Sequence, residues 1–131
     1  MRIARSLLDA IVEHAVRDAP HECCGVVLGR DRTATSVRKL ENLAASSFRF
    51  DIDGRELLPL VFADEDSEQL LAIYHSHTRS EPYPSQTDVN FAAGWPGVEW
   101  LIVGISKAAE PVSRSYLIDG GVIKDVELEI A

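Results

Sequence analysis

The sequence predicts an α/β (α+β) fold in which helices flank one mixed β-sheet, in a single domain over residues 1–131. Segments with apolar residues at helical spacing alternate with short apolar runs typical of strands, the pattern of a sheet covered by helices. The 131 residues, 46% of them hydrophobic, suffice for one core and are too few for two. No Gly-, Ser- or Pro-rich run divides the chain, and no internal repeat occurs.

The first helix is predicted from apolar residues that recur at helical spacing between Leu7 and Val16. Ser6 and Asp9, three residues apart, form a candidate capping pair at the start of this helix. Pro20 then stops the helix, because proline cannot continue the backbone hydrogen-bond pattern. We expect one apolar stripe of this helix to be buried.

Several strand-like runs follow the first helix. The apolar run Cys23–Leu28, closed by Gly29, predicts a strand, and Asp31-Arg32 predicts the turn after it. Thr35–Leu40 and Phe48–Phe50 are weaker strand candidates.

A second helix is predicted to open at Asp53, with Glu56 three residues further on. Pro59 falls inside this segment, and proline in a helix interior costs about 3 kcal/mol, so the bounds of the helix are poorly defined by the sequence. Its expected buried stripe consists of Leu57, Leu58, Val61 and Phe62.

The second half of the chain is expected to contain four strands and one short helix. A Gly-Gly pair marks a hairpin between the last two strands. The strands are Leu70–His75, Glu99–Ile105, Ser113–Ile118 and Val122–Ile130; the helix is Ser85–Ala93, ended by Gly94-Trp95-Pro96-Gly97; and the hairpin turn is Asp119-Gly120-Gly121.

The charge balance excludes two classes of partner. The chain carries 13 Lys+Arg against 21 Asp+Glu, a formal net charge of −8. A protein that binds nucleic acid or an anionic membrane needs clustered basic residues, so we expect neither partner. No apolar stretch is long enough to span a bilayer. The two cysteines, Cys23 and Cys24, are neighbours, a poor basis for a structural disulfide, which indicates a reduced, cytoplasmic setting.

A candidate metal site lies at the end of the predicted strand Leu70–His75. Side chains alternate along a strand, so His75 and His77 point to one side and Ser76 to the other. Two imidazoles on one side can share a metal ion, with Asp88 as a third ligand and a fourth position open for water, as in catalytic zinc sites. Two alternatives without a metal remain: an exposed pair of polar histidines, and a capping box in which Ser85 and Asp88 only start the short helix.

The combined spacing resembles a known family. His75-x-His77, seven residues, then Ser85-x-x-Asp88 is similar to the H-[ST]-H-x7-S-x-x-D signature of the JAMM metalloproteases, also called MPN-plus or JAB domains. Glu22 stands where these enzymes have a glutamate, in a segment that resembles their E-x-C-G strand. The resemblance runs from the first helix to at least Ile105 and implies a single JAMM/MPN-like domain with a curved, mixed sheet.

The resemblance implies a role for each residue of the site. His75, His77 and Asp88 would bind one Zn²⁺ per chain. Glu22 would be the general base toward a zinc-bound water that attacks the carbonyl, and would pass the proton to the leaving amine. Ser85 would donate a hydrogen bond to the developing oxyanion; the loss of one such donor costs on the order of 10²–10³ in rate in a serine protease.

Other polar residues near the signature receive weaker assignments. The loop Glu81-Pro82-Tyr83-Pro84 should rim the site, so Tyr83 is a candidate substrate contact, although a packed loop tyrosine is an equally good interpretation. Cys23 and Cys24 should lie on opposite faces of their strand, one of them in the core. His21 is interpreted as a surface residue.

The resemblance also implies the substrate class. JAMM enzymes hydrolyse amide or isopeptide bonds after the C-terminal tail of ubiquitin or a ubiquitin-like protein. The short chain resembles the bacterial CysO-cysteine peptidase type, which acts on a ubiquitin-like sulfur-carrier protein with a C-terminal Gly-Gly tail and releases cysteine for sulfur-amino-acid biosynthesis. The alternatives are a catalytically silent MPN-type scaffold or binding module, and a zinc hydrolase acting on another amide. The sequence assigns no oligomeric state.

Overall fold

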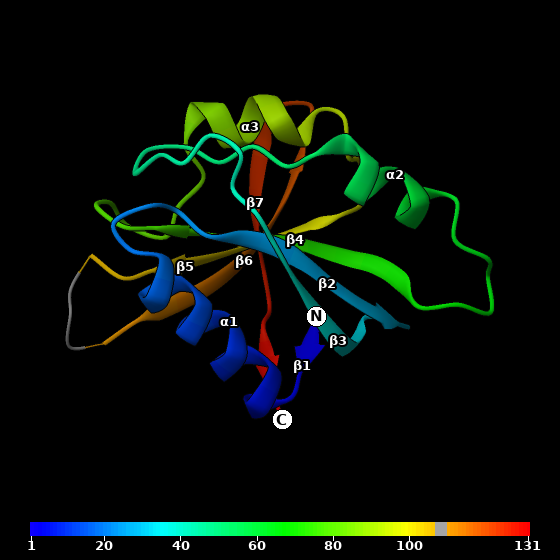
Figure 1. Cartoon of the computed structure of the whole chain (residues 1–131). Helices are drawn as coiled ribbons and strands as arrows, with labels where there is room; N and C mark the ends of the chain where they lie inside the picture. The colour runs from blue at the N-terminus through cyan, green and yellow to red at the C-terminus, as the bar shows by residue number, and fades with distance from the viewer. Residues whose placement is uncertain (107–109) are drawn as a thin grey trace.

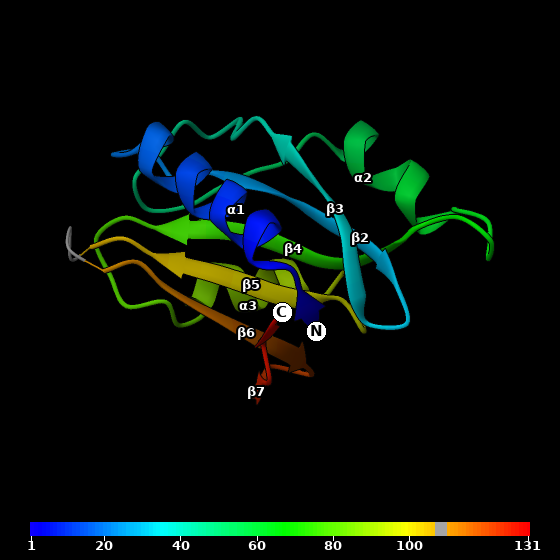
Figure 2. The ribbon, with the colours of Figure 1, turned by 90° about the horizontal axis from the view of Figure 1, so that it is seen from below.

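An eight-stranded mixed sheet organises the computed structural model, which describes residues 1–106 and 110–131. Helix α1 covers one face of the sheet, and α2 and α3 lie on the other (Figure 1). Seen from below, α1 crosses in front of the strands (Figure 2). The elements are β1 (Arg2–Ile3), α1 (Arg5–Asp18), β2 (Cys24–Arg30), β3 (Thr33–Leu40), α2 (Gly54–Val61), β4 (Gln69–His77), α3 (Gln86–Ala92), β5 (Glu99–Gly104), β6 (Val112–Asp119), β7 (Val122–Val126) and β8 (Glu129–Ile130).

The strand order is β7-β6-β5-β4-β2-β3-β1-β8, so the predicted mixed sheet is confirmed. β4 and β5 are parallel neighbours near the centre, whereas β2 is antiparallel to both β3 and β4. Parallel strands need a crossover connection, and α3 lies within it. As a result, the C-terminal ends of β4 and β5 meet at one edge, next to the N-terminal start of β2.

Helix α1 buries Leu8, Ile11 and Ala15 against the sheet, as the apolar spacing predicts. Two details of the prediction are wrong. Ser6 lies inside the helix, and its N-cap is Ala4, which offers no side-chain hydrogen bond. Val16 is exposed, because the apolar stripe is wider than the contact with the sheet.

The predicted turns are confirmed in position. Asp31 and Arg32 join β2 to β3 with φ of 51° and 63°, and Gly120 and Gly121 join β6 to β7 with φ of 56° and 80°. Two successive positive φ values match the twist of paired antiparallel strands. Gly29 lies within β2 and does not end it.

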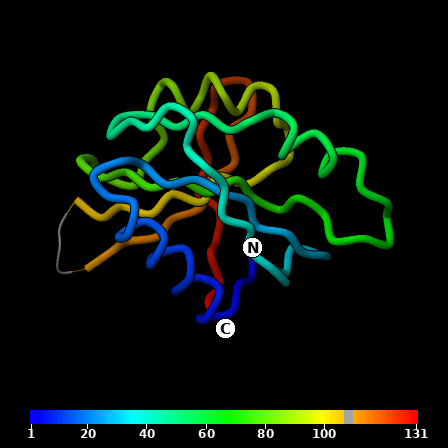
Figure 3. The backbone as a smooth tube through the Cα atoms, in the orientation of Figure 1, coloured from blue at the N-terminus to red at the C-terminus, as the bar shows by residue number. Residues whose placement is uncertain are grey.

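Two other expectations require correction. Phe48–Phe50 is not a strand: it belongs to the loop between β3 and α2, and buried Phe50 points into the core. Val122–Ile130 is interrupted, and its last part, β8, pairs with β1 at the opposite edge of the sheet. The termini therefore lie side by side (Figure 3).

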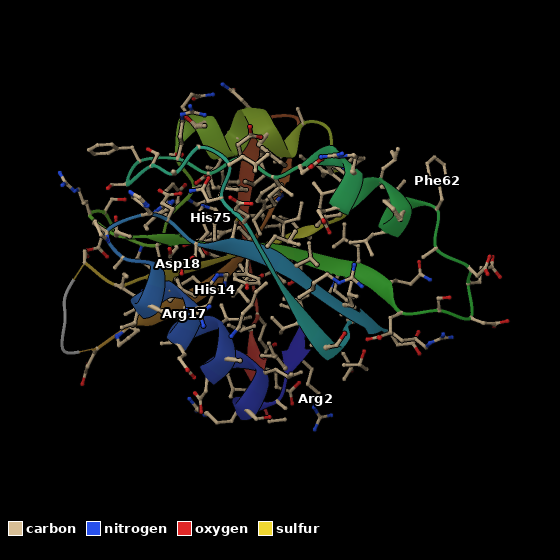
Figure 4. The ribbon with its side chains drawn as sticks, viewed as in Figure 1. Arg2, His14, Arg17, Asp18, Phe62 and His75 are labelled. Carbon is tan, nitrogen blue, oxygen red and sulfur yellow. The ribbon has the colours of Figure 1, made fainter. Side chains whose placement is uncertain are left out.

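Helix α2 opens at Asp53 and contains Pro59, as expected, but buries only Leu57. Leu58 and Phe62 are exposed, and Figure 4 shows Phe62 directed away from the sheet. The predicted stripe is wrong because Leu60, and not Leu58, Val61 or Phe62, packs beside Leu57 on the core.

The core has one layer on each face of the sheet. Cys23 packs in the layer under α1, and Cys24 in the layer under α2 and α3, so the two thiols lie on opposite faces. Both are free cysteines; the cytoplasmic setting inferred from them stays a prediction. Among the described residues, none of the helices is long and apolar enough to cross a membrane.

Candidate metal centre

The C-terminal end of β4 carries the two histidines of the candidate site. His75 and His77 point toward the α3 side, and both are buried, with 0% and 4% exposure. Figure 4 shows His75 on that side of the sheet and His14 on the side of α1. Ser76, between the two ligand candidates, points to the other side, where its Oγ accepts a hydrogen bond from the Cys23 N–H at 2.8 Å.

Helix α3 brings Asp88 to these histidines. Ser85 is the N-cap, and its Oγ accepts from the Asp88 N–H at 3.1 Å. In return, the Ser85 N–H donates to Asp88 Oδ2 at 2.9 Å, which completes a capping box. The same Oδ2 also faces the two imidazoles. The capping box and the approach to the histidines therefore coexist, a combination that the sequence allowed but did not establish.

Three ligand atoms form a triangle of equal sides. His75 Nε2, His77 Nε2 and Asp88 Oδ2 are each 3.1 Å from the other two. Ligands of a tetrahedral zinc at about 2.0–2.1 Å from the ion lie about 3.3 Å from one another, so the triangle has a suitable size. Two imidazoles and one carboxylate are also a common donor set of catalytic zinc. The residues fit zinc.

The ring orientation of His77 is held by a contact outside the triangle. His77 Nδ1 lies 2.8 Å from the backbone oxygen of Glu81, which can only accept, so Nδ1 carries the proton. This contact directs the Nε2 lone pair at the centre of the triangle, as in metal sites where an outer acceptor fixes the tautomer. His75 is held by packing, since its ring stacks on Phe50 with centroids 4.4 Å apart.

The electrostatics of the triangle favour a bound cation. Burial would raise the pKa of the Asp88 carboxyl, but the imidazoles and the Ser85 N–H lower it well below its usual range. Burial lowers the pKa of His75. For His77, burial acts in the same direction, but Asp88, the Glu81 carbonyl and Glu22 outweigh it and raise the pKa. An ionised carboxylate that attracts a proton to its neighbour will also attract a metal ion.

Glu22 lies two residues before β2 begins, close enough to the triangle for His77 and Asp88 to influence it. Its side chain is buried, and burial raises the pKa of its carboxyl to about 8, with His77 opposing and Asp88 adding to the shift. Among the described residues, Glu22 Oε1 is one of three buried side-chain atoms without a hydrogen-bond partner. A carboxylate oxygen is thus free to take a proton beside the three ligand atoms.

Two residues of the β3–α2 loop were missed by the sequence analysis. Phe50 supports His75, although the sequence suggested only a weak strand there. Asn42 donates to the backbone oxygen of Glu22 at 2.9 Å. The available signal was local: asparagine after a strand is typical of a side chain that bonds nearby backbone. Nothing in the spacing connects it with Glu22, twenty residues earlier.

The structure places the remaining residues as follows. Tyr83 is 55% exposed on the loop after His77, and its ring meets the edge of Tyr116 with centroids 5.6 Å apart. Tyr83 is available at the rim, and a contact with substrate stays a prediction.

His21 is exposed, as expected. Cys23 and Cys24 are buried, and burial raises the pKa of each thiol to about 12, so neither is a thiolate near neutral pH.

Comparison with known proteins gives consistent matches. A family model described as prokaryotic homologs of the JAB domain matches residues 4–119. CysO-cysteine peptidase of Mycobacterium tuberculosis is 35% identical over 127 residues, which cover 94% of this chain and 86% of that protein. Desampylase of Haloferax volcanii is 34% identical over 110 residues, which cover 78% of each chain.

A solved structure matches the whole architecture. The solution structure of a protein from Desulfitobacterium hafniense superposes with a TM-score of 0.85 at 28% identity, covering 100% of this chain and 93% of that one. The fold class and the family indicated by the signature are therefore both confirmed.

Proposed function

The chain belongs to the JAB (JAMM) family and is a JAMM-type peptidase, and from that premise we propose that it hydrolyses the amide bond after the Gly-Gly C-terminal tail of a ubiquitin-like sulfur-carrier protein. The leaving group in this proposal is cysteine, which would serve sulfur-amino-acid biosynthesis. The observation that carries the hydrolytic chemistry is the triangle of His75, His77 and Asp88 with the buried Glu22 carboxyl beside it.

In this proposal, His75, His77 and Asp88 hold one zinc ion per chain. A bound zinc would supply Lewis-acid chemistry, lowering the pKa of a coordinated water from about 15.7 to near 7. The chain contributes the orientation of the donors. Glu81 fixes the ring of His77, Phe50 packs on the ring of His75, and the capping box holds Asp88.

Glu22 is the proposed general base. Its carboxyl group is desolvated, and its raised pKa of about 8 places it near the working pH, where a base takes and returns a proton most effectively. The unpartnered Oε1 holds the proton removed from the attacking water and then delivers it to the leaving amine. A cation bound by the three donors would favour the ionised carboxylate that this role requires.

Ser85 is the proposed oxyanion donor. Its Oγ accepts from the Asp88 N–H, so the capping bond uses a lone pair and leaves the hydroxyl proton free. The N-cap position keeps this hydroxyl beside Asp88, close to where the substrate carbonyl would meet the ligand atoms. A fixed donor of this kind stabilises charge that develops during addition to the carbonyl.

The substrate class rests on the relatives. CysO-cysteine peptidase and desampylase each match most of this chain. A tail ending in Gly-Gly suits a reacting centre that is reached past buried side chains, because glycine adds no side-chain volume. The tail would approach as an extended segment along the sheet.

The test is hydrolysis of a carrier protein with a single cysteine after its C-terminal Gly-Gly, followed by mass spectrometry. We expect the wild-type enzyme to remove the cysteine, and a chelator to stop it. Glu22→Gln, which removes the base and leaves the three ligand candidates, is the matched control and should leave the carrier intact. An intact carrier in the wild-type reaction, together with cleavage of an unrelated amide, would contradict the substrate and favour a zinc hydrolase of another class.

A further inference from the structure

We propose that Asn42 is a positioning residue that holds Glu22 in place beside the ligand atoms. This inference rests on the proposed role of Glu22 as general base. Asn42 lies in the loop between β3 and α2, outside the family signature, and its side chain makes its hydrogen bonds to backbone groups, none of which belongs to His75, His77 or Asp88. Its effect on the reaction would therefore pass through the backbone of Glu22.

The side-chain amide of Asn42 makes all four hydrogen bonds that an amide can make. Nδ2 donates to the backbone oxygens of Glu22 at 2.9 Å and Arg49 at 3.1 Å. Oδ1 accepts from the N–H groups of Ala44 and Asp51, both at 3.0 Å. Two carbonyls on one side and two N–H groups on the other allow only one orientation of the amide.

Glu22 needs such a partner because it lies outside the sheet. The pairing of β2 with its neighbours begins at Cys24, which lies opposite Leu40 and His75. Residues of the loop supply the hydrogen-bond partners that a neighbouring strand would otherwise provide for the Glu22 N–H and oxygen. The Glu22 N–H donates to the Ser46 oxygen at 2.8 Å, and the Glu22 oxygen accepts from Asn42.

The same loop also supports a ligand candidate. Asn42 ties the two ends of the loop together through Ala44 and Asp51, and Phe50, next to Asp51, stacks on His75. One amide thus links the segment that carries the base to the segment that packs on the metal site. Errors of about 1 Å in the placement of a catalytic group can cost 10²-fold in rate, so this link has a kinetic consequence.

The test uses Asn42→Asp, which replaces only the NH₂ group by an oxygen. The acceptor bonds from Ala44 and Asp51 remain, whereas the bond to Glu22 is lost and a carboxylate faces two carbonyl oxygens. We expect kcat to fall about 10- to 100-fold, with KM changed by less than about twofold and the zinc content unchanged. Asn90→Asp, the same change on the exposed side of α3 where Oδ1 accepts from Gln86, is the matched control and should behave as wild type.

A kcat of Asn42→Asp within twofold of wild type would overturn the proposal. So would a loss of zinc that accounts for the loss of activity, since Asn42 would then support the ligands and not the base.

Amide hydrogen exchange gives a readout that needs no substrate and no variant. In wild-type protein, the side-chain NH₂ protons of Asn42 should exchange slowly, because both are donated to backbone oxygens, whereas those of Asn90 should exchange fast. Equal rates at the two residues would contradict the proposal even if Asn42→Asp failed to fold. If wild-type protein cleaves no carrier but shows the protected Asn42 amide, the proposed substrate fails while the positioning contact stands.

Discussion

At the scale of single residues, the candidate base owes its chemistry to burial. Glutamate in water is ionised far below neutral pH and is a weak base, but the desolvated Glu22 has its pKa raised to about 8. A cation bound by the neighbouring ligand atoms would lower this pKa again, because it stabilises the carboxylate. The pKa of Glu22 thus depends on whether the metal centre is loaded.

Removing this base should separate metal binding from hydrolysis. Glu22→Gln keeps the size of the side chain, and we expect it to retain zinc while activity falls about 10²- to 10⁴-fold, the usual contribution of a general base. Metal analysis and the carrier assay on the same sample check this. Retained turnover would contradict the assignment of Glu22, and lost metal would make it a ligand.

A second buried histidine, His14, lies on the opposite face of the sheet and predicts a pH-dependent stability. Its Nδ1 lies 2.7 Å from the Tyr74 hydroxyl and its Nε2 3.1 Å from Asp18 Oδ2, which suits a neutral ring that accepts from tyrosine and donates to the carboxylate. Burial lowers the pKa of His14 although Asp18 opposes the shift. The folded state therefore binds fewer protons than the unfolded chain below the ordinary histidine pKa of about 6.5.

The stability that His14 contributes should be present above about pH 6.5 and lost as the pH falls below that value. His14→Gln should lower the free energy of unfolding by about 1–3 kcal/mol at neutral pH, because the partners lose a buried hydrogen bond, and should flatten the curve on the acid side. Urea unfolding at a series of pH values measures both effects. His21→Gln, a change at an exposed histidine, is the control; an equal flattening there would argue against His14.

At the scale of elements, the residues that start helix α3 are also residues of the candidate site. The capping box is a common way to start a helix, yet here its Asp88 oxygen also faces two imidazoles and its Ser85 hydroxyl keeps a free proton. The two hydrogen bonds of the capping box thus fix the start of the helix and also hold Asp88 toward the imidazoles. A substitution at Ser85 should affect both properties.

Ser85→Ala should lower the free energy of unfolding by about 1 kcal/mol through the lost cap and reduce kcat about 10²- to 10³-fold through the lost oxyanion donor. Asp53→Ala is the matched control, since Asp53 caps α2 by accepting from the Arg55 N–H at 2.9 Å and lies outside the metal centre. It should show the same loss of stability without the loss of rate. Equal activity in the two variants would contradict the role of Ser85.

The elements also show how far a sequence pattern predicts a structure. The strands with continuous apolar runs and both tight turns lie where expected, because burial and positive φ leave strong local signals. Ser6 failed as a cap and β8 was missed, because both depend on how distant segments meet. For the site, spacing offered His75, His77 and Asp88 as a candidate ligand set beside other interpretations, the family resemblance favoured that set, and the structure brings the three residues together. Glu22 was found only through the family resemblance, and Asn42 carries no signal beyond its own loop.

At the scale of the whole molecule, a bound ion would connect β4 to α3, two elements joined by the loop that contains Tyr83. Without a cation, the triangle holds an ionised Asp88 beside two imidazoles in a buried place. A metal ion that binds only the folded chain adds its binding free energy to the stability of the fold.

Zinc should therefore raise the thermal unfolding temperature of metal-free protein. At a free zinc concentration 100 times the dissociation constant, the expected gain in folding free energy is about 2.7 kcal/mol. The gain should disappear in Asp88→Asn, which lacks the anionic ligand. Calorimetry of both proteins with and without zinc measures it, and an equal shift in the variant would place the ion elsewhere.

The most direct test of the metal centre is a crystal structure of the zinc-loaded protein with anomalous diffraction at the zinc edge. We expect one ion per chain, about 2.0–2.1 Å from His75 Nε2, His77 Nε2 and Asp88 Oδ2, with the Glu22 carboxyl facing its open position. Loaded protein in which the anomalous peak lies away from these three atoms, or in which no peak occurs, would contradict the account.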